Sequence, residues 1–317
     1  TSTDVSRFDA DYEYVFEHTI GDAHLVAPAL AIETVAAGGG SVCWFDGSAL
    51  KVGPDSAGAD PGPACYGKGG PLTITDVNLL LGRLDAAMFE IPIRRDSACL
   101  RFEELVKNIN SNRQRKLDND TILQGFLDIA NERMAEAIRR ISVRKGFEIG
   151  EYVLVAFGGA GAMHACGVAG ILGINKIVIP TDAGLLSAVG LGSAVIERFA
   201  HKQMLCLLDD IVRDGELDRI LASLRESAIE LVKEECKSLV IDDIFVRRQI
   251  LNLRLTGQES TISIDYDDDT INLVDVFVDR YEQMYGHKPG DRAVEVESVR
   301  IVASTKSRAG VLEKYIY

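Results

Sequence analysis

Four short segments carry the residue types that phosphate chemistry needs. In the first, three hydroxyl residues, Thr1, Ser2 and Thr3, precede Asp4. Hydroxyls and a carboxylate at the start of a strand are groups that contact a phosphate and its metal ion. A frayed polar terminus is the competing interpretation, and this segment by itself does not decide between the two.

The second segment is a run of three glycines, Gly38, Gly39 and Gly40, followed by Ser41. Consecutive glycines let the backbone approach a ligand closely and point several N–H groups in one direction. A flexible turn has the same composition, so both interpretations stay open.

The third segment is a loop over residues 53–67 that is dense in Gly, Pro, Asp and Ser. Its prolines stiffen the chain while its glycines supply unusual torsions, a combination typical of active-site loops. Cys65 is expected to be a packed thiol, because no histidine adjoins it in the sequence. We expect this loop to lie beside the 38–41 turn, since both adopt costly backbone geometry.

The fourth segment, 157–165, contains Gly158, Gly159 and Gly161 and then His164. A glycine turn between a strand and a helix is an anion site, because free N–H groups and the helix dipole converge there. The turn is not a Walker A loop, since no Gly-Lys-Ser/Thr follows it. His164 is a candidate acid, base or ligand, or else a packed core histidine.

The elements around the fourth segment predict an α/β fold. The uninterrupted apolar run Tyr152–Phe157 is typical of a central strand buried on both faces, within a mixed and partly parallel sheet. A helix over 163–172, a strand over 176–179 and a helix over 184–195 follow it.

Other elements are predicted from hydrophobic periodicity and from turn-forming and capping residues. They are a hairpin of 41–45 with 49–52 around Asp46-Gly47, a helix from Thr75 or Asp76 to Leu84, and a long helix from Asp118 or Asp120 to Gly146. The last third of the chain predicts helices over 217–236 and 273–285 and strands over 245–255, 261–266 and 294–303.

Composition narrows the function classes. The net charge of −14 argues against a nucleic-acid partner, which usually meets a basic patch. No apolar run reaches the ~20 residues of a membrane span. The six cysteines have no CxxC spacing, which predicts reduced thiols in a cytoplasmic protein. An acidic protein can bind ATP if backbone amides hold the phosphates.

Taken together, these segments resemble the hydantoinase A/5-oxoprolinase family. The resemblance is carried, in the family's order, by 1–6, 34–41, 52–67, Thr75-Asp76-Val-Asn78, Leu81-Gly-Arg-Leu84, 157–165 and 184–190. It implies an α/β fold like the actin/Hsp70/sugar-kinase ATPase core. Residues 1–200 would form the ATPase-like domain without its N-terminal lobe, and 201–317 a C-terminal α+β region.

The resemblance also implies an activity: ATP-dependent hydrolytic opening of a five-membered cyclic amide or imide, 5-oxoproline or a hydantoin, through a phosphorylated intermediate. The implied cofactors are ATP and Mg²⁺. The candidate catalytic residues are Asp4, Asp60 and His164, with Asp4 also the metal ligand. The candidate nucleotide contacts are Thr1, Ser2, Thr3, Gly38, Gly39, Gly40, Ser41, Gly158, Gly159 and Gly161.

Two other functions stay open. The β-type subunits of ATP-dependent ketone carboxylases look similar and act on a different substrate, and a non-catalytic assembly subunit would bind partners without turnover. The expected partners are the missing N-terminal lobe, a hydantoinase B-type subunit and further copies in an oligomer. Because the family's first phosphate loop belongs to that lobe, we expect this chain alone to lack ring-opening activity.

Overall fold

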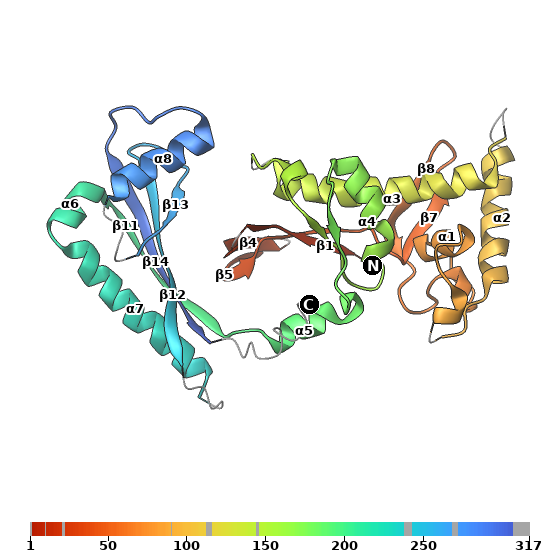
Figure 1. The fold of residues 1–317 in the computed structure, drawn as a ribbon, viewed down its shortest axis with the longest axis horizontal. Helices are drawn as coiled ribbons and strands as arrows, with labels where there is room; N and C mark the ends of the chain where they lie inside the picture. The colour runs from red at the N-terminus through yellow and green to blue at the C-terminus, as the bar shows by residue number, and fades with distance from the viewer. Residues whose placement is uncertain are drawn as a thin grey trace. The chain divides into compact units, whose positions relative to one another are not determined.

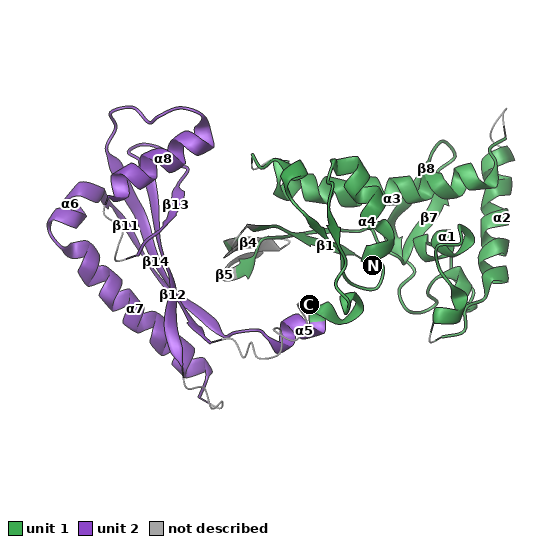
Figure 2. Ribbon diagram, viewed as in Figure 1, with its two compact units in different colours: residues 1–187 green, residues 188–317 purple. Residues whose placement is uncertain are grey.

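The contacts of the chain divide it into two compact units, residues 1–187 and 188–317 (Figure 2). The computed structural model describes residues 2–9, 11–20, 23–89, 91–111, 116–143, 146–237, 243–267 and 272–306. Each unit is described by itself. The domain boundary expected at residue 200 rests on the family resemblance and stays a prediction.

The first unit begins with four antiparallel strand pairs (Figure 1). They are β1 (Thr3–Ser6) with β6 (Ile32–Val35), β2 (Phe8–Asp9) with β3 (Asp11–Tyr12), β4 (Tyr14–Ile20) with β5 (Ala23–Leu30), and β7 (Ser41–Phe45) with β8 (Leu50–Ser56). The hairpin predicted around Asp46-Gly47 is confirmed as β7–β8. Strand β8 continues to Ser56, so part of the predicted loop is extended and paired.

The helices of this unit are α1 (Ile74–Leu80), α2 (Arg95–Ser111), α3 (Asn119–Ile141) and α4 (Gly161–Leu172). Asp118 caps α3 as predicted, since its carboxylate accepts a hydrogen bond from the Thr121 N–H at 2.8 Å. Helix α3 ends at Ile141, before the predicted Gly146. The cap of α1 is Thr73, not Thr75 or Asp76, because Thr73 and Asp76 form a reciprocal capping box.

Helix α3 contributes to two hydrophobic clusters of the first unit. Near its start, Ile122 and Phe126 pack against Val52 of β8 and Phe102 of α2. Nearer its end, Met134 and Ala135 join a cluster with Ala37 and with Val168 of α4, and α3 and α4 lie side by side (Figure 1). One helix thus connects the hairpin β7–β8 to the segment that carries His164.

The strand predicted over 152–157 is only partly as expected. Strand β9 is short (Leu154–Val155) and pairs in parallel with β10 (Ile177–Val178). Leu154 packs under α3 and α4, but Val153 and Val155 are 44% and 49% exposed. The prediction of a strand buried on both faces was wrong, because among the described residues helices cover only one face of this sheet.

The second unit is an antiparallel sheet in the order β11-β14-β12-β13, covered by helices. Its strands are β11 (Glu197–Leu207), β12 (Ile244–Leu255), β13 (Ile262–Asp265) and β14 (Val294–Thr305), and its helices are α6 (Leu208–Arg213), α7 (Glu216–Glu235) and α8 (Leu273–Tyr285). Every predicted helix and strand after residue 216 is present, whereas β11 was not predicted. Helix α5 (Leu186–Gly192) contains the division between the units.

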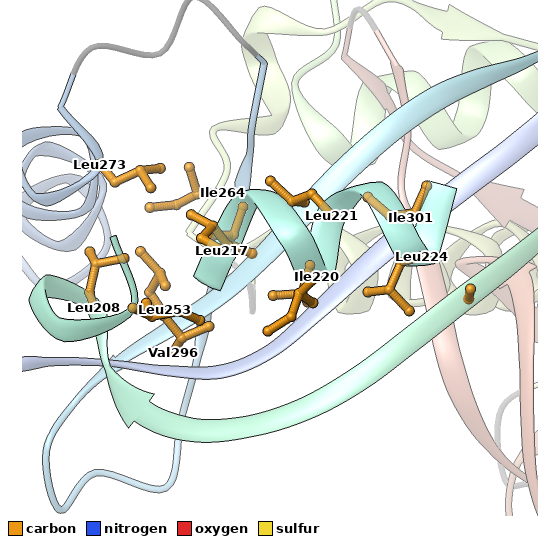
Figure 3. Close-up of a cluster of buried hydrophobic side chains, with 14 of the residues drawn as sticks. Leu208, Leu217, Ile220, Leu221, Leu224, Leu253, Ile264, Leu273, Val296 and Ile301 are labelled. Carbon is orange, nitrogen blue, oxygen red and sulfur yellow. The ribbon is translucent and has the colours of Figure 1, made fainter. Parts of the chain in front are cut away.

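The core of the second unit lies between its helices and one face of the sheet. Figure 3 shows Leu217, Ile220, Leu221 and Leu224 of α7 among side chains from the strands, including Leu253. These four residues recur at helical spacing, so a single apolar stripe on α7 builds the core. No helix among the described residues is long and apolar enough to cross a membrane.

Helix α7 offers a matched test of this packing. Leu221 is 1% exposed and Leu231, on the same helix, is 41% exposed. We expect Leu221→Ala to lower the free energy of unfolding by about 2–5 kcal/mol, because it leaves a cavity. Leu231→Ala is the control and should change it by less than about 1 kcal/mol. Equal effects in urea titrations would show that the stripe on α7 is not the core.

Candidate functional site

The glycine turn 38–41 is closed by its own serine. The Gly38 N–H donates to Ser41 Oγ at 3.0 Å, and the Ser41 N–H donates to the Gly38 carbonyl at 3.0 Å. Ser41 is fully buried, so its hydroxyl holds the turn in shape and is not offered to solvent. Just before the turn, Thr3 Oγ1 donates to the Ala37 carbonyl at 2.6 Å, which ties strand β1 to the same place.

Two other segments meet this turn. The N–H and the hydroxyl of Thr75 both donate to the Gly39 carbonyl, at 2.8 and 2.9 Å. The Ala57 N–H donates to the Gly40 carbonyl at 2.9 Å, which confirms that the loop 53–67 lies beside the turn. A Cβ placed on Gly39 would lie 3.8 Å from the Cβ of Ala160. The second and fourth candidate segments are therefore neighbours.

The loop itself is held by the buried carboxylate of Asp76. That carboxylate accepts hydrogen bonds from the N–H groups of Ala64, Cys65 and Thr73 at 3.0, 2.7 and 2.8 Å, and from Thr73 Oγ1 at 2.9 Å. Four donors satisfy a fully buried charge that would otherwise be costly. Burial, and after it the charge of Asp76, raise the pKa of the Cys65 thiol, so Cys65 is the packed thiol expected and not a nucleophile.

The turn 158–161 leads directly into helix α4. Gly158 has a φ of 87°, in the left-handed region that glycine tolerates, and its N–H donates to the Ala183 carbonyl at 2.8 Å. Gly159 is exposed, and a Cβ on it would meet nothing within 4 Å. The helix N-cap, Ala160, has no side chain that can cap. The first N–H groups of α4 are consequently left to backbone, water or ligand partners.

His164 lies in the first turns of α4 and is only 2% exposed. Its Nδ1 is 2.8 Å from Oδ1 of Asn131 on α3, and its buried Nε2 has no hydrogen-bond partner among the described residues. Burial, and after it the positive charge of Arg83, lower the pKa of His164 to about 4. The imidazole is therefore uncharged at neutral pH and carries a single N–H proton.

The two candidate carboxylates lie elsewhere. Asp4 is exposed on β1 and accepts a hydrogen bond from Thr34 Oγ1 at 2.7 Å. Asp60 is exposed in the loop and pairs with Lys68 Nζ at 3.5 Å. Among the described residues, no hydrogen bond or ion pair links either one to His164. No group of three His, Cys, Asp or Glu side chains in that part of the chain is placed to hold a metal ion.

Two candidate residues remain: Ser2 is exposed, and Thr1 lies outside the described residues.

Three residues that build the site were not among the residues predicted from the sequence. They are Thr75, Asp76 and Asn131. The Thr73-x-x-Asp76 spacing is a capping-box signal that points to Asp76. Nothing in the sequence near His164 points to Asn131, which is 33 positions away.

The first unit combines a mixed α/β fold with two adjoining glycine turns, and these turns form a candidate phosphate site. The chain belongs to the Hydantoinase/oxoprolinase family, whose model matches residues 1–199. It is 38% identical over 324 residues to the 5-oxoprolinase of Saccharomyces cerevisiae, covering 97% of this chain and 24% of that protein. The chain spans about a quarter of the length of four of the curated relatives it matches, that protein among them.

Two solved structures share the fold. The ATP-dependent caprolactamase of Pseudomonas jessenii is 27% identical with a TM-score of 0.72, over 89% of this chain and 42% of that one. A nucleotide-free acetone carboxylase is 20% identical with a TM-score of 0.69, over 96% of this chain and 45% of that one, and this likeness concerns the fold alone. The α/β fold class predicted from the sequence is confirmed.

The Asp76 network predicts a large effect of a very small change. Asp76→Asn keeps the shape but turns one acceptor into a donor that faces N–H groups. We expect the free energy of unfolding to fall by about 1–3 kcal/mol, because buried donors lose their partner. Asp60→Asn, in the exposed part of the same loop, is the control and should leave it unchanged. A thermal melt in which the two variants coincide would contradict this account of the loop.

Proposed function

We propose that the first unit binds the phosphates of ATP where the turns 38–41 and 158–161 meet. The observation that carries this proposal is the proximity of Gly39 to Ala160, which brings two glycine backbones and the start of α4 to one place. Backbone N–H groups and a helix dipole attract phosphate without a lysine. Such a site suits a chain whose net charge is −14.

The complete protein that contains this unit is, in our proposal, an ATP-dependent hydrolase of a cyclic amide. Relatives named 5-oxoprolinase and caprolactamase subunit alpha support this substrate class. An unactivated lactam resists water. Transfer of the γ-phosphoryl group forms a bond from phosphorus to the amide oxygen, breaks the bond to ADP and leaves a better electrophile. Water then adds to the carbon, and the C–N bond breaks as nitrogen takes a proton, which leaves an acyl phosphate. A second water hydrolyses the acyl phosphate to the carboxylate and free phosphate.

Asp4 is the residue we propose for a Mg²⁺ ion. Mg²⁺ usually keeps several waters and takes one or two carboxylates together with the phosphates of the substrate. The exposed Asp4 offers one such carboxylate, already hydrogen-bonded by Thr34, so the chain's own residues fit a shared site and not a complete protein cage. The ion would neutralise phosphate charge during transfer. Asp60, exposed in the loop, keeps only a proposed role in positioning water.

Gly159 gives the sharpest test of the phosphate site. Because open space surrounds the position of its Cβ, Gly159→Val is expected to fold normally. The added side chain should block the approach of a phosphate to the backbone, and ATP-coupled turnover should fall by at least about 10²-fold, as when an oxyanion donor is lost. The matched control is Gly170→Ala on α4, also in open space, which should keep wild-type turnover.

The assay measures ADP and ring-opened product with Mg-ATP and 5-oxoproline, hydantoin or caprolactam, with acetone plus bicarbonate as a separate arm. Product from a cyclic amide supports the proposal. ADP formed only with acetone and bicarbonate would favour the ketone carboxylase alternative. Wild-type ATP affinity and turnover in Gly159→Val would show that the nucleotide does not bind at this turn.

The apolar face of β9 supports a proposal about partners. Val155 of β9 is exposed, as are Val153 and Phe157, which stand at alternate positions on either side of it, and Val178 of β10. A parallel sheet is normally covered on both faces, and two strands alone are marginal in water. We propose that this face is covered by other polypeptide of the longer family subunit, of which this chain spans about a quarter.

Cysteine labelling tests whether other polypeptide covers this face of β9. Val155→Cys should react with a maleimide readily in the chain alone and at least about tenfold more slowly in the longer subunit. Leu100→Cys, exposed on α2, is the control and should react at the same rate in both. Equal rates for Val155→Cys in the two proteins would contradict the proposal. Protection that appears in the chain alone at high concentration would instead indicate a second copy.

A further inference from the structure

A buried polar pair connects the two central helices of the first unit. Asn131 is 4% exposed on α3 and His164 is 2% exposed on α4, and their side chains meet at 2.8 Å. The helices otherwise pack through apolar residues such as Met134 and Val168. A buried polar pair in such an interface is costly unless its hydrogen bond is made, so its geometry is constrained.

Gly167 fixes how the amide of Asn131 lies. Gly167 follows His164 by three positions and so lies on the same side of α4. A Cβ on Gly167 would stand 2.3 Å from Nδ2 of Asn131, 3.0 Å from its Cγ and 3.6 Å from its Oδ1. The amide therefore rests against the bare backbone of Gly167, with its oxygen toward the imidazole. Only glycine leaves room for this arrangement.

The hydrogen bond to Asn131 and the unpartnered Nε2 distinguish the two neutral forms of the ring. If Nδ1 carries the proton, it donates to Asn131 Oδ1 at 2.8 Å and Nε2 presents a lone pair. If Nε2 carried the proton, its buried N–H would have no acceptor among the described residues, and Nδ1 and Oδ1 would face each other as two acceptors. An unpaired buried donor is costly, so this geometry favours the proton on Nδ1.

We propose that Asn131 is a positioning residue that holds His164 as the Nδ1–H tautomer, with the buried Nε2 as a hydrogen-bond acceptor. The pKa of about 4 keeps this form uncharged at neutral pH. The inference rests on the proposed function for its consequence: in any hydrogen bond between His164 and nucleotide or substrate, the ligand is the donor. His164 is then a hydrogen-bond acceptor through Nε2 and not a general acid.

The tautomer is measured directly by ¹⁵N NMR of the imidazole nitrogens. The chain has five histidines, so His164 is assigned by comparison with His164→Gln. At about pH 8 we expect a protonated Nδ1 and an unprotonated Nε2 in the wild type. Asn131→Asp, which keeps an acceptor, should retain this form, and Asn131→Leu should lose it. A protonated Nε2 in the wild-type chain would overturn the proposal, whether or not Asn131→Leu folds.

Turnover in the complete enzyme supplies the second readout. Asn131→Leu should lower kcat by at least about tenfold with a smaller change in KM for ATP, and Asn131→Asp should recover most of the loss. A purely structural role would alter stability in both variants without following the tautomer. Loss of ATP coupling in the wild type together with the predicted NMR result would refute the proposed function and leave the tautomer assignment standing. Full activity in a folded Asn131→Leu would refute the positioning role.

Discussion

The Asp76 carboxylate is the constraint on which the candidate site depends. It gathers N–H groups from Ala64 and Cys65 in the loop and from Thr73 at the start of α1. The next residues of α1 include Thr75, which binds the Gly39 carbonyl through two donors. One buried charge thus sets the loop and the helix start, and the helix start in turn sets the glycine turn. A rigid supporting shell of this kind is what a phosphate site needs.

Helix α3 supplies the other half of the support. It packs against β8 near its start and against α4 near its end, where Asn131 meets His164. The two glycine turns are therefore held from different directions, one by the Asp76 network and one by the α3–α4 interface. Their meeting at Gly39 and Ala160 is a consequence of the fold, because the two turns are separated by about 120 residues in the sequence.

Local signals in the sequence were sufficient for much of this. Asp118 marks the start of α3, and the Asp46-Gly47 turn gives the β7–β8 hairpin. The helix predicted over 273–285 is observed with the same bounds. Signals that depend on distant partners were not. The apolar run 152–157 does not reveal which of its faces is covered, and the sequence around His164 does not reveal Asn131. Asp60 stays a proposed water-positioning residue, and its exposed carboxylate is paired with Lys68.

Hydrogen–deuterium exchange with a saturating non-hydrolysable ATP analogue and Mg²⁺ tests the central claim most directly. If the two turns form one phosphate site, amides of 38–41 and of 158–164 should become protected together, and those of α7 in the second unit should not change. The same pattern should disappear in Gly159→Val. Protection of only one of the two turns, or protection that persists in that variant, would contradict a shared nucleotide site.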